Sequence, residues 1–454
     1  MISTRSLTLL RTWVSLLVPT AVGSSATVLA DPIVPACTVE EYATGIDRPI
    51  RMSFDPLSGF LYVGRNSSNP TVKIWRVNKD RTFREYGDAP VHDPDTAVFV
   101  DGDFCVNIEG TPTNLNGAVL TGGHYDSTQG IIEAIMPDES VITVFGPTDA
   151  WEDPTDLVFD NNLRLLFGDH GDGPDSHLVF ARAKECDAGD PVQFFPTARA
   201  DFIAVDSQNR IWTLDIDGVI KVHDENGTPL DNCFAQGFSG HIYIRIGPGG
   251  PWVNDLYVAN TNGELWRYVA PEPNMDVCPT KAEPDEIVGT NFPTEYDIEF
   301  GPDQALYVSI EAENRILRIF PDCNDNGIPD ECDIGCGPTG GLCDVNGCGE
   351  SNDCNENGIP DECDLEDGTL HDDNSDGVPD ECGACCGSFG DVGCSQWSPD
   401  LCEDNGGVYL GDGTVCEGDA CPIPTVSEWG LMVMALLVLT AGTLVYTRRR
   451  SAQM

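Results

Sequence analysis

The composition of the chain changes sharply after Phe320, and this change limits what each part can fold into. Residues 321–421 contain 26 Asp or Glu and no Lys or Arg, and they hold 14 of the 19 cysteines. Few large apolar side chains occur there, so this part cannot bury much of a hydrophobic core. We therefore expect metal ions and disulfides to hold it together, whereas residues 37–320 have the composition of an ordinary β-rich globular domain.

Three copies of one short motif lie in this acidic part, at 322–333, 353–364 and 372–382. Each complete copy has Asp or Asn at positions 1, 3 and 5, Gly at position 6, and Asp at positions 9 and 12. The third copy lacks the last carboxylate, because Gly383 stands there. Ca2+ takes about six to eight oxygen ligands in a flexible shell, and glycine allows the sharp turn that such a loop requires.

The backbone carbonyl of position 7 can supply a further ligand, so the spacing predicts calcium loops. The predicted ligands are Asp322, Asn324, Asn326, Ile328, Asp330, Asp333, Asp353, Asn355, Asn357, Ile359, Asp361, Asp364, Asp372, Asn374, Asp376, Val378 and Asp380. Magnesium prefers a tight octahedron with retained waters and suits the motif less well. Zinc bound through the cysteines, or an acidic disordered spacer, are the alternatives.

The copies resemble thrombospondin type 3 repeats and, more loosely, dockerin loops, over residues 322–383. A dockerin would follow each loop with an amphipathic helix, and residues 334–338 contain two Gly and a Pro, which disfavour one. We therefore expect a calcium-stiffened stalk. Cysteines at positions 2 and 11 of the first two copies form disulfides either within each loop or between neighbouring loops, and the sequence leaves both pairings open. A second cysteine group predicts a small disulfide-held module at 384–421.

Residues 37–320 contain a repeated strand pattern. Residues 50–63 and 296–308 both show an alternating strand, a turn of Asp or Gly with Pro, and a second strand ending in Leu-Tyr-Val. Weaker strand pairs are expected at 98–106, 157–167, 203–214 and 244–258. Period-2 alternation is typical of strands, and a repeat of about 40–50 residues with several strands is typical of propeller blades. The pattern predicts a six-bladed β-propeller over 37–320, with a β-sandwich or two smaller β domains as the alternative.

The blade pattern resembles the NHL and gluconolactonase-like propellers. In the lactonase branch, the resemblance implies one divalent ion in the central channel, held by Glu, Asn and Asp side chains from different blades. No such set can be assigned to this chain, and residues 45–49 lack the Glu-Gly-Pro signature of that branch. The resemblance therefore leaves enzymatic activity undecided and favours its absence.

One loop, residues 168–177, carries three carboxylates and two imidazoles. Such groups can bind a metal or act as acid and base, but the same composition is typical of a solvated loop, which is our preferred interpretation. The sequence contains no Gly-x-Ser-x-Gly elbow, no His-Glu-x-x-His motif and no phosphate-binding Gly-rich loop.

The N-terminal 30 residues predict a secretory signal peptide. Arg5 and Arg11 form a basic region before a mostly apolar stretch, which small residues follow, so we expect cleavage after Ala30 or Ala26. An N-terminal anchor is the alternative. The 19 cysteines agree with export, because disulfides persist outside the reducing cytosol.

The C-terminal segment, residues 422–454, predicts a sorting signal. Trp429 to Tyr446 is an uncharged run of 18 residues, which just spans a hydrocarbon core of about 30 Å as a transmembrane helix. The basic residues 448–450 should remain in the cytoplasm. With the stretch 423–430 upstream, residues 422–450 resemble the IPTL-type sorting signals that exosortase-like proteases process. The resemblance implies that the helix is removed and the mature chain moves to the outer surface; a simple C-terminal membrane anchor is the alternative.

The fold class expected is therefore mainly β: a six-bladed β-propeller followed by a Cys-rich, calcium-loop stalk and one C-terminal transmembrane helix. The formal charge of −51 argues against nucleic acid as a partner. We expect an exported, envelope-anchored surface protein whose propeller channel binds a surface ligand that the sequence does not identify. The alternatives are an extracellular metal-dependent lactonase-like hydrolase, which carboxylates converging on the propeller axis would favour, and a structural envelope component.

Overall fold

The computed structural model describes residues 32–34, 37–170, 179–194, 200–215, 218–240, 242–249, 252–269, 283–293, 296–324, 326–373, 375, 377–387, 394–404 and 406–416. The predicted signal peptide, residues 1–30, and the predicted sorting segment, residues 422–454, lie outside this part of the chain. Within the described part, no helix has both the length and the apolar character needed to cross a membrane. The predicted transmembrane helix, residues 429–446, is not among these residues.

The described residues before Pro321 form six antiparallel sheets of four strands each, which confirms the mainly β fold. The first three sheets are β2 (Pro49–Phe54), β3 (Leu61–Arg65), β4 (Thr71–Val77) and β5 (Phe83–His92); β6 (Val98–Phe99), β9 (Val119–His124), β10 (Gly130–Ile135) and β11 (Val141–Thr148); and β12 (Pro154–Phe159), β13 (Leu165–Asp169), β14 (Val179–Arg182) and β15 (Val192–Gln193). The other three are β16 (Ala200–Val205), β17 (Ile211–Asp215), β18 (Val219–His223) and β19 (Pro229–Gln236); β20 (Tyr243–Ile246), β21 (Leu256–Asn260), β22 (Glu264–Tyr268) and β23 (Glu286–Thr290); and β24 (Asp297–Phe300), β25 (Leu306–Ile310), β26 (Arg315–Pro321) and β1 (Cys37–Thr44).

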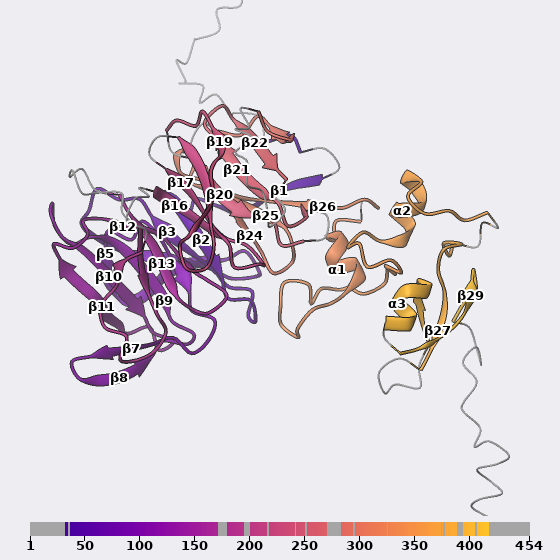
Figure 1. Cartoon of the computed structure of the whole chain (residues 1–454), viewed down its shortest axis with the longest axis horizontal. Helices are drawn as coiled ribbons and strands as arrows, with labels where there is room; N and C mark the ends of the chain where they lie inside the picture. Colours follow the sequence, from indigo (N-terminus) through magenta and orange to yellow (C-terminus); the bar gives the residue numbers. More distant parts are fainter. Residues whose placement is uncertain are drawn as a thin grey trace, which may run out of the picture.

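These sheets form a ring, which makes the domain a β-propeller (Figure 1). Neighbouring sheets meet through their first strands: β2 contacts β6, β12 contacts β16, β16 contacts β20, β20 contacts β24, and β24 contacts β2, while β9 joins the second sheet to β12. The N-terminal strand β1 pairs with β26, with Cys37 opposite Pro321 and Thr44 opposite Arg315. The two ends of the domain therefore share one sheet, and the ring closes without an open edge between them.

The repeated Leu-Tyr-Val pattern marks second strands, which are buried on both faces. Leu61 to Val63 in β3 and Leu306 to Val308 in β25 are at most 4 % exposed. The turn before β3 follows from its sequence, because the Asp55 carboxylate accepts hydrogen bonds from the backbone N–H groups of Leu57 and Ser58. Predicted and observed strand pairs agree at this blade and at the last one.

The second sheet differs from the prediction that 98–106 holds a blade-strand pair. Val98–Phe99 is the first strand, but residues after it form a separate two-stranded ribbon, β7 (Cys105–Ile108) and β8 (Thr111–Asn114), and the chain returns to the sheet only at β9. A disulfide ties Cys105 in this ribbon to Cys186. The ribbon is therefore an insertion between the first and second strands of this sheet.

The acidic part follows the propeller without a linker, because β26 ends at Pro321 and the first loop motif begins at Asp322. A short 3-10 helix, η2 (Glu311–Glu313), precedes β26, and helices α1 (Asp330–Ile334) and α2 (Asp361–Asp367) lie within the loops. Helix α1 ends before Gly335, as expected, but α2 continues for three residues past its loop motif.

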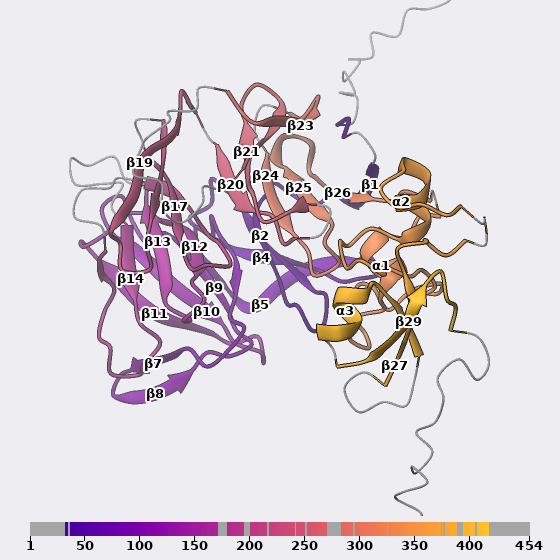
Figure 2. The ribbon, with the colours of Figure 1, turned by 45° about the vertical axis from the view of Figure 1, so that its right-hand side comes forward.

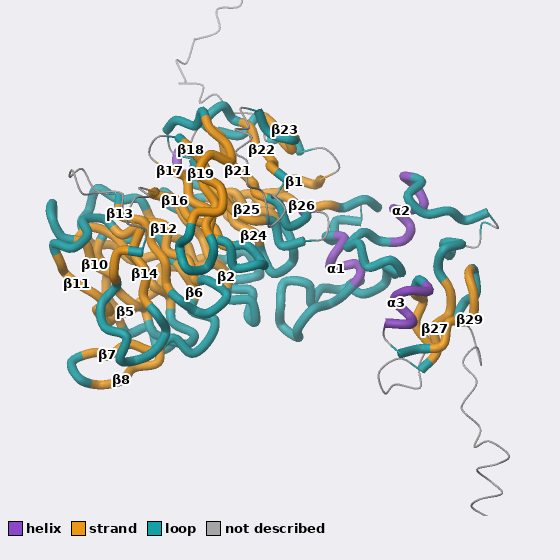
Figure 3. The backbone as a smooth tube through the Cα atoms, viewed as in Figure 1, coloured by secondary structure: helices purple, strands orange, loops and turns teal. Residues whose placement is uncertain are grey.

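The loops lie at one side of the propeller and project from it (Figures 1 and 3), and a residue of the insert between the first two loops contacts the propeller core. Leu342 contacts the core cluster that contains Tyr42, Phe54 and Tyr307. A Cβ atom added at Gly59, in the turn between β2 and β3, would lie 3.0 Å from the Cγ atom of Leu342. The apolar side chain of Leu342 thus docks on the first blade, since its burial there removes apolar surface from water.

The disulfides link neighbouring loops, which settles the choice that the sequence left open. Position 2 of one copy is joined to position 11 of the next, in Cys323–Cys363 and again in Cys354–Cys382. The insert between the first two loops is closed by Cys332–Cys343 and Cys336–Cys348. Among the described cysteines, Cys37 is the free one.

The C-terminal module is a small sheet with one helix, visible in yellow in Figure 2. Strands β28 (Cys394–Trp397), β27 (Gly383–Cys386) and β29 (Val408–Asp412) pair in that order, and α3 (Pro399–Asp404) connects β28 to β29. The disulfides Cys385–Cys402 and Cys394–Cys416 staple it.

Candidate functional site

The first loop gathers four of its predicted ligands around one point. The carboxylate of Asp322 accepts hydrogen bonds from the backbone N–H groups of Asn326 and Gly327, both at 3.0 Å. The side-chain amides of Asn324 and Asn326 donate to Asp333 at 3.1 and 2.9 Å. Gly327 has φ +83°, the left-handed backbone that the curl of the loop requires. Positions 1, 3, 5 and 12 therefore face each other, as the spacing predicts.

The second loop repeats this geometry. Asp353 accepts from the backbone N–H groups of Asn357 at 3.2 Å and Gly358 at 2.8 Å. The side-chain amides of Asn355 and Asn357 both donate to Oδ2 of Asp364 at 2.9 Å. Asp364 is 0 % exposed, and its Oδ1 atom has no hydrogen-bond partner among the described residues. Since a buried carboxylate oxygen without a partner costs free energy, this oxygen is suited to a metal ion.

The side chain at position 9 is bonded to the backbone of position 2 in each loop. Asp330 and Asp361 accept hydrogen bonds from the backbone N–H groups of Cys323 and Cys354, both at 2.9 Å. Burial, followed by smaller effects of neighbouring acids, raises the pKa of both carboxyls to about 6. The acids that contribute to these shifts include positions 1 and 12 of the same loop, so the position 9 carboxyl lies near them in both loops.

The backbone of position 7 supports the ring of side chains in both loops. The N–H groups of Ile328 and Ile359 donate to Oδ1 of the Asn at position 5, at 2.7 and 2.8 Å. These bonds hold the position 5 amide in place.

The third copy keeps part of this geometry. Asp372 accepts from the backbone N–H of Gly377, and Asp380 accepts from that of Asp373, both at 2.8 Å. Its predicted ligands Asn374 and Asp376 lie outside the described residues, and Val378 lies within them.

The missing carboxylate of the third copy has a structural reason. A Cβ atom at Gly383 would lie 2.7 Å from the hydroxyl of Tyr409 and 2.2 Å from the carbonyl oxygen of Gly411. Strand β29 therefore occupies the space that a position 12 side chain would need.

Cysteine ligation of zinc does not fit these loops. The groups Cys323, Asp330 and Cys363, and Cys354, Asp361 and Cys382, each place three potential ligand atoms within 4.8 Å of one another. In both groups, however, the two sulfur atoms are joined in a disulfide. Because a metal requires the thiolate, these sulfurs are not ligands, and the oxygen-rich loops remain the candidate metal sites.

The propeller carries a second candidate site, a buried charge cluster on its axis. Arg51 is the extra residue of a β-bulge in β2, and Asp156 lies in a bulge of β12 with φ +40°. Bulges re-aim side chains next to functional sites, and a strained non-glycine residue is a pointer to function. Asp156 Oδ1 lies 4.0 Å from Nε of Arg51 and 3.4 Å from Nη1 of Arg245, which in turn donates from Nε to Glu299 at 2.9 Å.

Two members of this cluster lack hydrogen-bond partners among the described residues. The Nε atom of Arg51 has none, and its guanidinium lies over the rings of Phe202 and Tyr243, 5.2 and 5.4 Å from their centroids. Asp297 is 2 % exposed, and neither of its carboxylate oxygens has a partner. Burial raises the pKa of Asp297 to about 7, against the opposing effect of Arg245 and Arg51.

A cavity of about 280 Å³ adjoins the cluster and is lined by residues from the first strands of all six sheets. Its wall is apolar at Met52, Phe99 and Phe159, and charged at Asp156 and Arg245. The channel therefore offers a small chamber with an apolar wall and one polar end.

A third set of titratable groups lies where strands of the second and third sheets begin or end. Nδ1 of His124 lies 3.3 Å from Asp153 and 3.7 Å from Asp93, and these carboxylates raise the pKa of His124 to about 10. Burial, with Asp153 and Asp93, raises the pKa of Asp95 to about 7. No local sequence pattern indicates this set, because its members belong to different repeats.

The loop 168–177 is only partly described, since residues 171–178 lie outside the described part. Asp169 is buried and accepts hydrogen bonds from the backbone N–H groups of Glu152 and Asp153, at 2.8 and 2.9 Å. This carboxylate therefore fixes the backbone just before β12, which is a structural role.

Comparison with known proteins identifies one segment. A family model described as the IPTL-CTERM motif matches residues 422–450. The chain ends in an IPTL-type sorting motif. No relative is found among curated proteins. The motif agrees with the sequence prediction for this segment and indicates an exported, cell-surface protein that a sorting enzyme of the exosortase type processes.

Solved structures with a similar chain path are distant. They include a gluconolactonase from Xanthomonas campestris (12 % identity, 63 % of this chain and 90 % of that chain covered, TM-score 0.45). A soluble aldose sugar dehydrogenase from Escherichia coli (12 %, 63 % and 100 %, 0.44) and a virginiamycin B lyase from Staphylococcus aureus (13 %, 62 % and 99 %, 0.41) are comparable. At these values we draw no conclusion about activity from the similarity.

Proposed function

We propose that this protein is an exported surface protein whose propeller is a ligand-binding module, and whose two complete acidic loops each hold one Ca2+ that fixes the loops against the propeller. The observation that carries the calcium assignment is the convergence of positions 1, 3, 5 and 12 in both loops, with the buried and unpartnered oxygen of Asp364. Residues 321–421 contain no Lys or Arg, so bound cations would offset the repulsion among their carboxylates.

The six four-stranded sheets and their closed contacts support a six-bladed propeller as the binding module. Its channel has a chamber lined from all six sheets, and the Arg51 and Asp297 side chains beside it retain unused hydrogen-bonding capacity. A small ligand in this chamber would find an apolar wall, with Arg245 as a donor beside the acceptors Asp156 and Glu299.

The lactonase-like alternative finds less support in this channel. A catalytic divalent ion would need several carboxylate or amide oxygens directed at one point without competing cations. Here the guanidinium groups of Arg51 and Arg245 lie among Asp156 and Glu299. At this level of the channel a dication would be repelled by two fixed positive charges, which is why we favour binding over metal-dependent hydrolysis.

Surface display is supported by the IPTL-type motif. In this proposal the chain passes the membrane at least transiently through 429–446, and a sorting protease of the exosortase type acts on the motif. A purely structural envelope component is the remaining alternative, and it requires self-association of the purified chain.

Three measurements on the full chain, made in an oxidising compartment, test the proposal. Titration calorimetry should detect calcium binding that the double substitution Asp333→Asn and Asp364→Asn removes from both complete loops. The matched substitution Asp400→Asn, at an exposed position in α3 outside the loops, should leave it unchanged. Hydrolysis of aldonolactones in the presence of added divalent ions would instead support the lactonase, and concentration-dependent assembly would support the structural role.

A further inference from the structure

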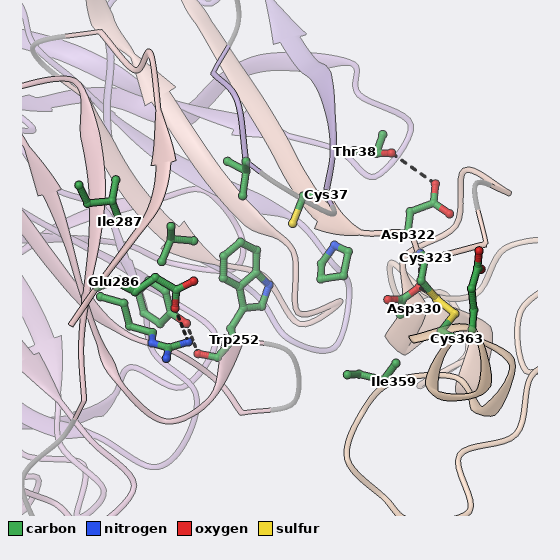
Figure 4. Close-up of a pocket in the computed structure, with 16 residues that line it drawn as sticks. Cys37, Thr38, Trp252, Glu286, Ile287, Asp322, Cys323, Asp330, Ile359 and Cys363 are labelled. Atoms are coloured by element: carbon green, nitrogen blue, oxygen red, sulfur yellow. Dashed lines mark hydrogen bonds and ion pairs between the residues drawn. A yellow bond between two sulfur atoms is a disulfide. The ribbon is translucent and has the colours of Figure 1, made fainter. Parts of the chain in front are cut away.

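A second cavity lies outside the propeller channel, between the propeller and the first two calcium loops (Figure 4). Its volume is about 650 Å³, within the range of about 300–1,000 Å³ typical of ligand sites, which are frequent where domains meet. One wall comes from the propeller and includes Trp252 and Ile287; the other comes from the loops and includes Asp330 and Glu366. We refer to it as the loop cleft.

The propeller wall of the loop cleft contains a buried hydrogen-bond donor without a partner. Trp252 is 3 % exposed, and its ring packs against those of Tyr257 and Phe300. Its Nε1–H group has no acceptor among the described residues, and the nitrogen lies on the side of the ring that faces the loops (Figure 4). Since a buried N–H without an acceptor costs free energy, a ligand that presents a carbonyl oxygen there would gain a hydrogen bond.

The charges around the loop cleft are mostly negative. Glu286, Asp322, Asp330 and Glu366 line it, and among the described lining residues Arg267 is the one cation. Arg267 is already paired with Glu286, with 2.9 Å between Nη1 and Oε2. When Ca2+ occupies the first loop and neutralises Asp322, the exposed carboxylate of Glu366 still faces the cleft. An anion would be repelled, and a cation attracted.

The cleft also offers apolar contact at its rim. Ile287, on β23, is 48 % exposed and lies beside Glu286 in the lining. A ligand that suits this cleft therefore combines a cationic group, a carbonyl oxygen and an apolar side chain. A peptide segment that carries Lys or Arg next to an aliphatic residue has all three.

We propose that the loop cleft is a binding site for a cationic peptide segment, distinct from the propeller channel. In this proposal, the loops form one wall of a binding site in addition to binding calcium. Neutral sugars would leave the carboxylates unmatched, so they are not the expected ligands.

The test uses the full chain saturated with calcium and a fluorescent, acetylated peptide of alternating leucine and lysine, with an otherwise identical leucine and glutamate peptide as the probe of charge. Fluorescence anisotropy should show binding of the lysine peptide alone. Glu366→Gln should weaken it roughly two- to fivefold, the range of an exposed ion pair. Trp252→Phe, which keeps the ring and removes the N–H group, should weaken it about two- to tenfold.

Two control substitutions separate this site from its surroundings. Glu350→Gln changes an exposed glutamate of the same acidic part that does not line the cleft, and it should leave the affinity unchanged. Glu299→Gln alters the channel cluster and should also have no effect. A loss with Glu299→Gln equal to that with Glu366→Gln would place the peptide in the channel and overturn the proposal.

Equal binding of the two peptides, or competition by a neutral disaccharide such as maltose, would also overturn it. Trp252 belongs to a core cluster, so its substitution needs circular dichroism to show that the fold is kept. Glu366 is exposed and carries no such requirement, so an unchanged affinity in Glu366→Gln is sufficient to reject the proposal.

Discussion

The substitution Asp364→Asn isolates the contribution of one of the two proposed calcium loops. Asp364 stands at position 12 of the second loop, is fully buried, and has one oxygen bonded to two asparagine amides and one oxygen without a partner. The change to Asn removes the one full charge at this position and leaves the shape of the side chain nearly the same. We expect the second loop to lose its ion while the first loop, centred on Asp333, keeps its own.

The magnitude follows from linkage. An ion that binds only the folded loop at a free concentration of 100 times Kd stabilises it by about 2.7 kcal/mol. With two equivalent loops, the free energy of unfolding of the wild-type chain should be higher in calcium than in chelator by about twice that amount. Asp364→Asn should reduce this difference by about half. For each variant, the free energy of unfolding in chelator is subtracted from that in calcium. The subtraction cancels any change that the substitution causes in the ion-free chain.

The assay combines titration calorimetry, which counts ions, with denaturant unfolding in calcium and in chelator. The matched control is Asp400→Asn, which changes an exposed carboxylate in α3 outside the loops. The reasoning is refuted if Asp364→Asn binds as many ions as wild type, or if its calcium-dependent gain in stability equals that of wild type. A wild-type chain equally stable with and without calcium would refute the calcium assignment itself.

Three further predictions concern titration, cross-linking and thiol reactivity. Burial raises the pKa of Asp297 from 3.8 to about 7, so between these pH values the folded state holds a proton that the unfolded state has released. The contribution of Asp297 to the free energy of unfolding should therefore fall as pH rises from about 4 to about 7. Asp297→Asn should flatten that decline when denaturation is measured as a function of pH. Replacing both Cys323 and Cys363 by Ser frees the first loop from the second, and calorimetry should show weaker calcium binding to both. The half-buried Cys37 thiol lines the loop cleft, and desolvation and Asp330 raise its pKa to about 12. At about pH 8 iodoacetamide should therefore label it much more slowly in the folded than in the unfolded chain, as mass spectrometry can establish.

The cross-linking prediction has an internal control. Replacing Cys105 and Cys186 removes a disulfide in the propeller, at the β7–β8 ribbon. The pair is remote from the loops in sequence, so calcium affinity should not change. Equal losses in both double variants would mean that the disulfides act only through global stability.

The sequence was sufficient for features that a short stretch of chain encodes. The loop motifs carry their side chains within twelve residues, so the spacing predicts ligands at positions 1, 3, 5, 7, 9 and 12. The structure joins positions 3 and 5 to position 12 by hydrogen bonds in both loops. The Leu-Tyr-Val strands were also predicted, because their apolar pattern lies within a few residues. In the structure, residues such as Tyr307 are buried in a strand that is covered on both faces. The side chains at position 9, Asp330 and Asp361, accept a hydrogen bond from the backbone N–H of position 2, next to the position 1 carboxylate.

Long-range pairing was not predictable in the same way. The β7–β8 ribbon interrupts the second blade, and period-2 alternation cannot distinguish a strand that stays in the sheet from one that leaves it. The pairing of β1 with β26 joins opposite ends of the propeller sequence, and no local sequence pattern predicts it. The docking of Leu342 against the first blade likewise depends on where the ring places that surface.

The charge cluster on the propeller axis shows why a channel site resists prediction from one sequence. In a regular strand, the alternation of Ile50, Arg51 and Met52 would send the arginine to the face opposite its neighbours. The bulge in β2 adds a residue at this point and changes where Arg51 lies. Its partner Asp156 depends on a second bulge, in β12. Two local irregularities, made adjacent only by closure of the ring, therefore decide whether the channel presents carboxylates to a metal or ion pairs to a ligand.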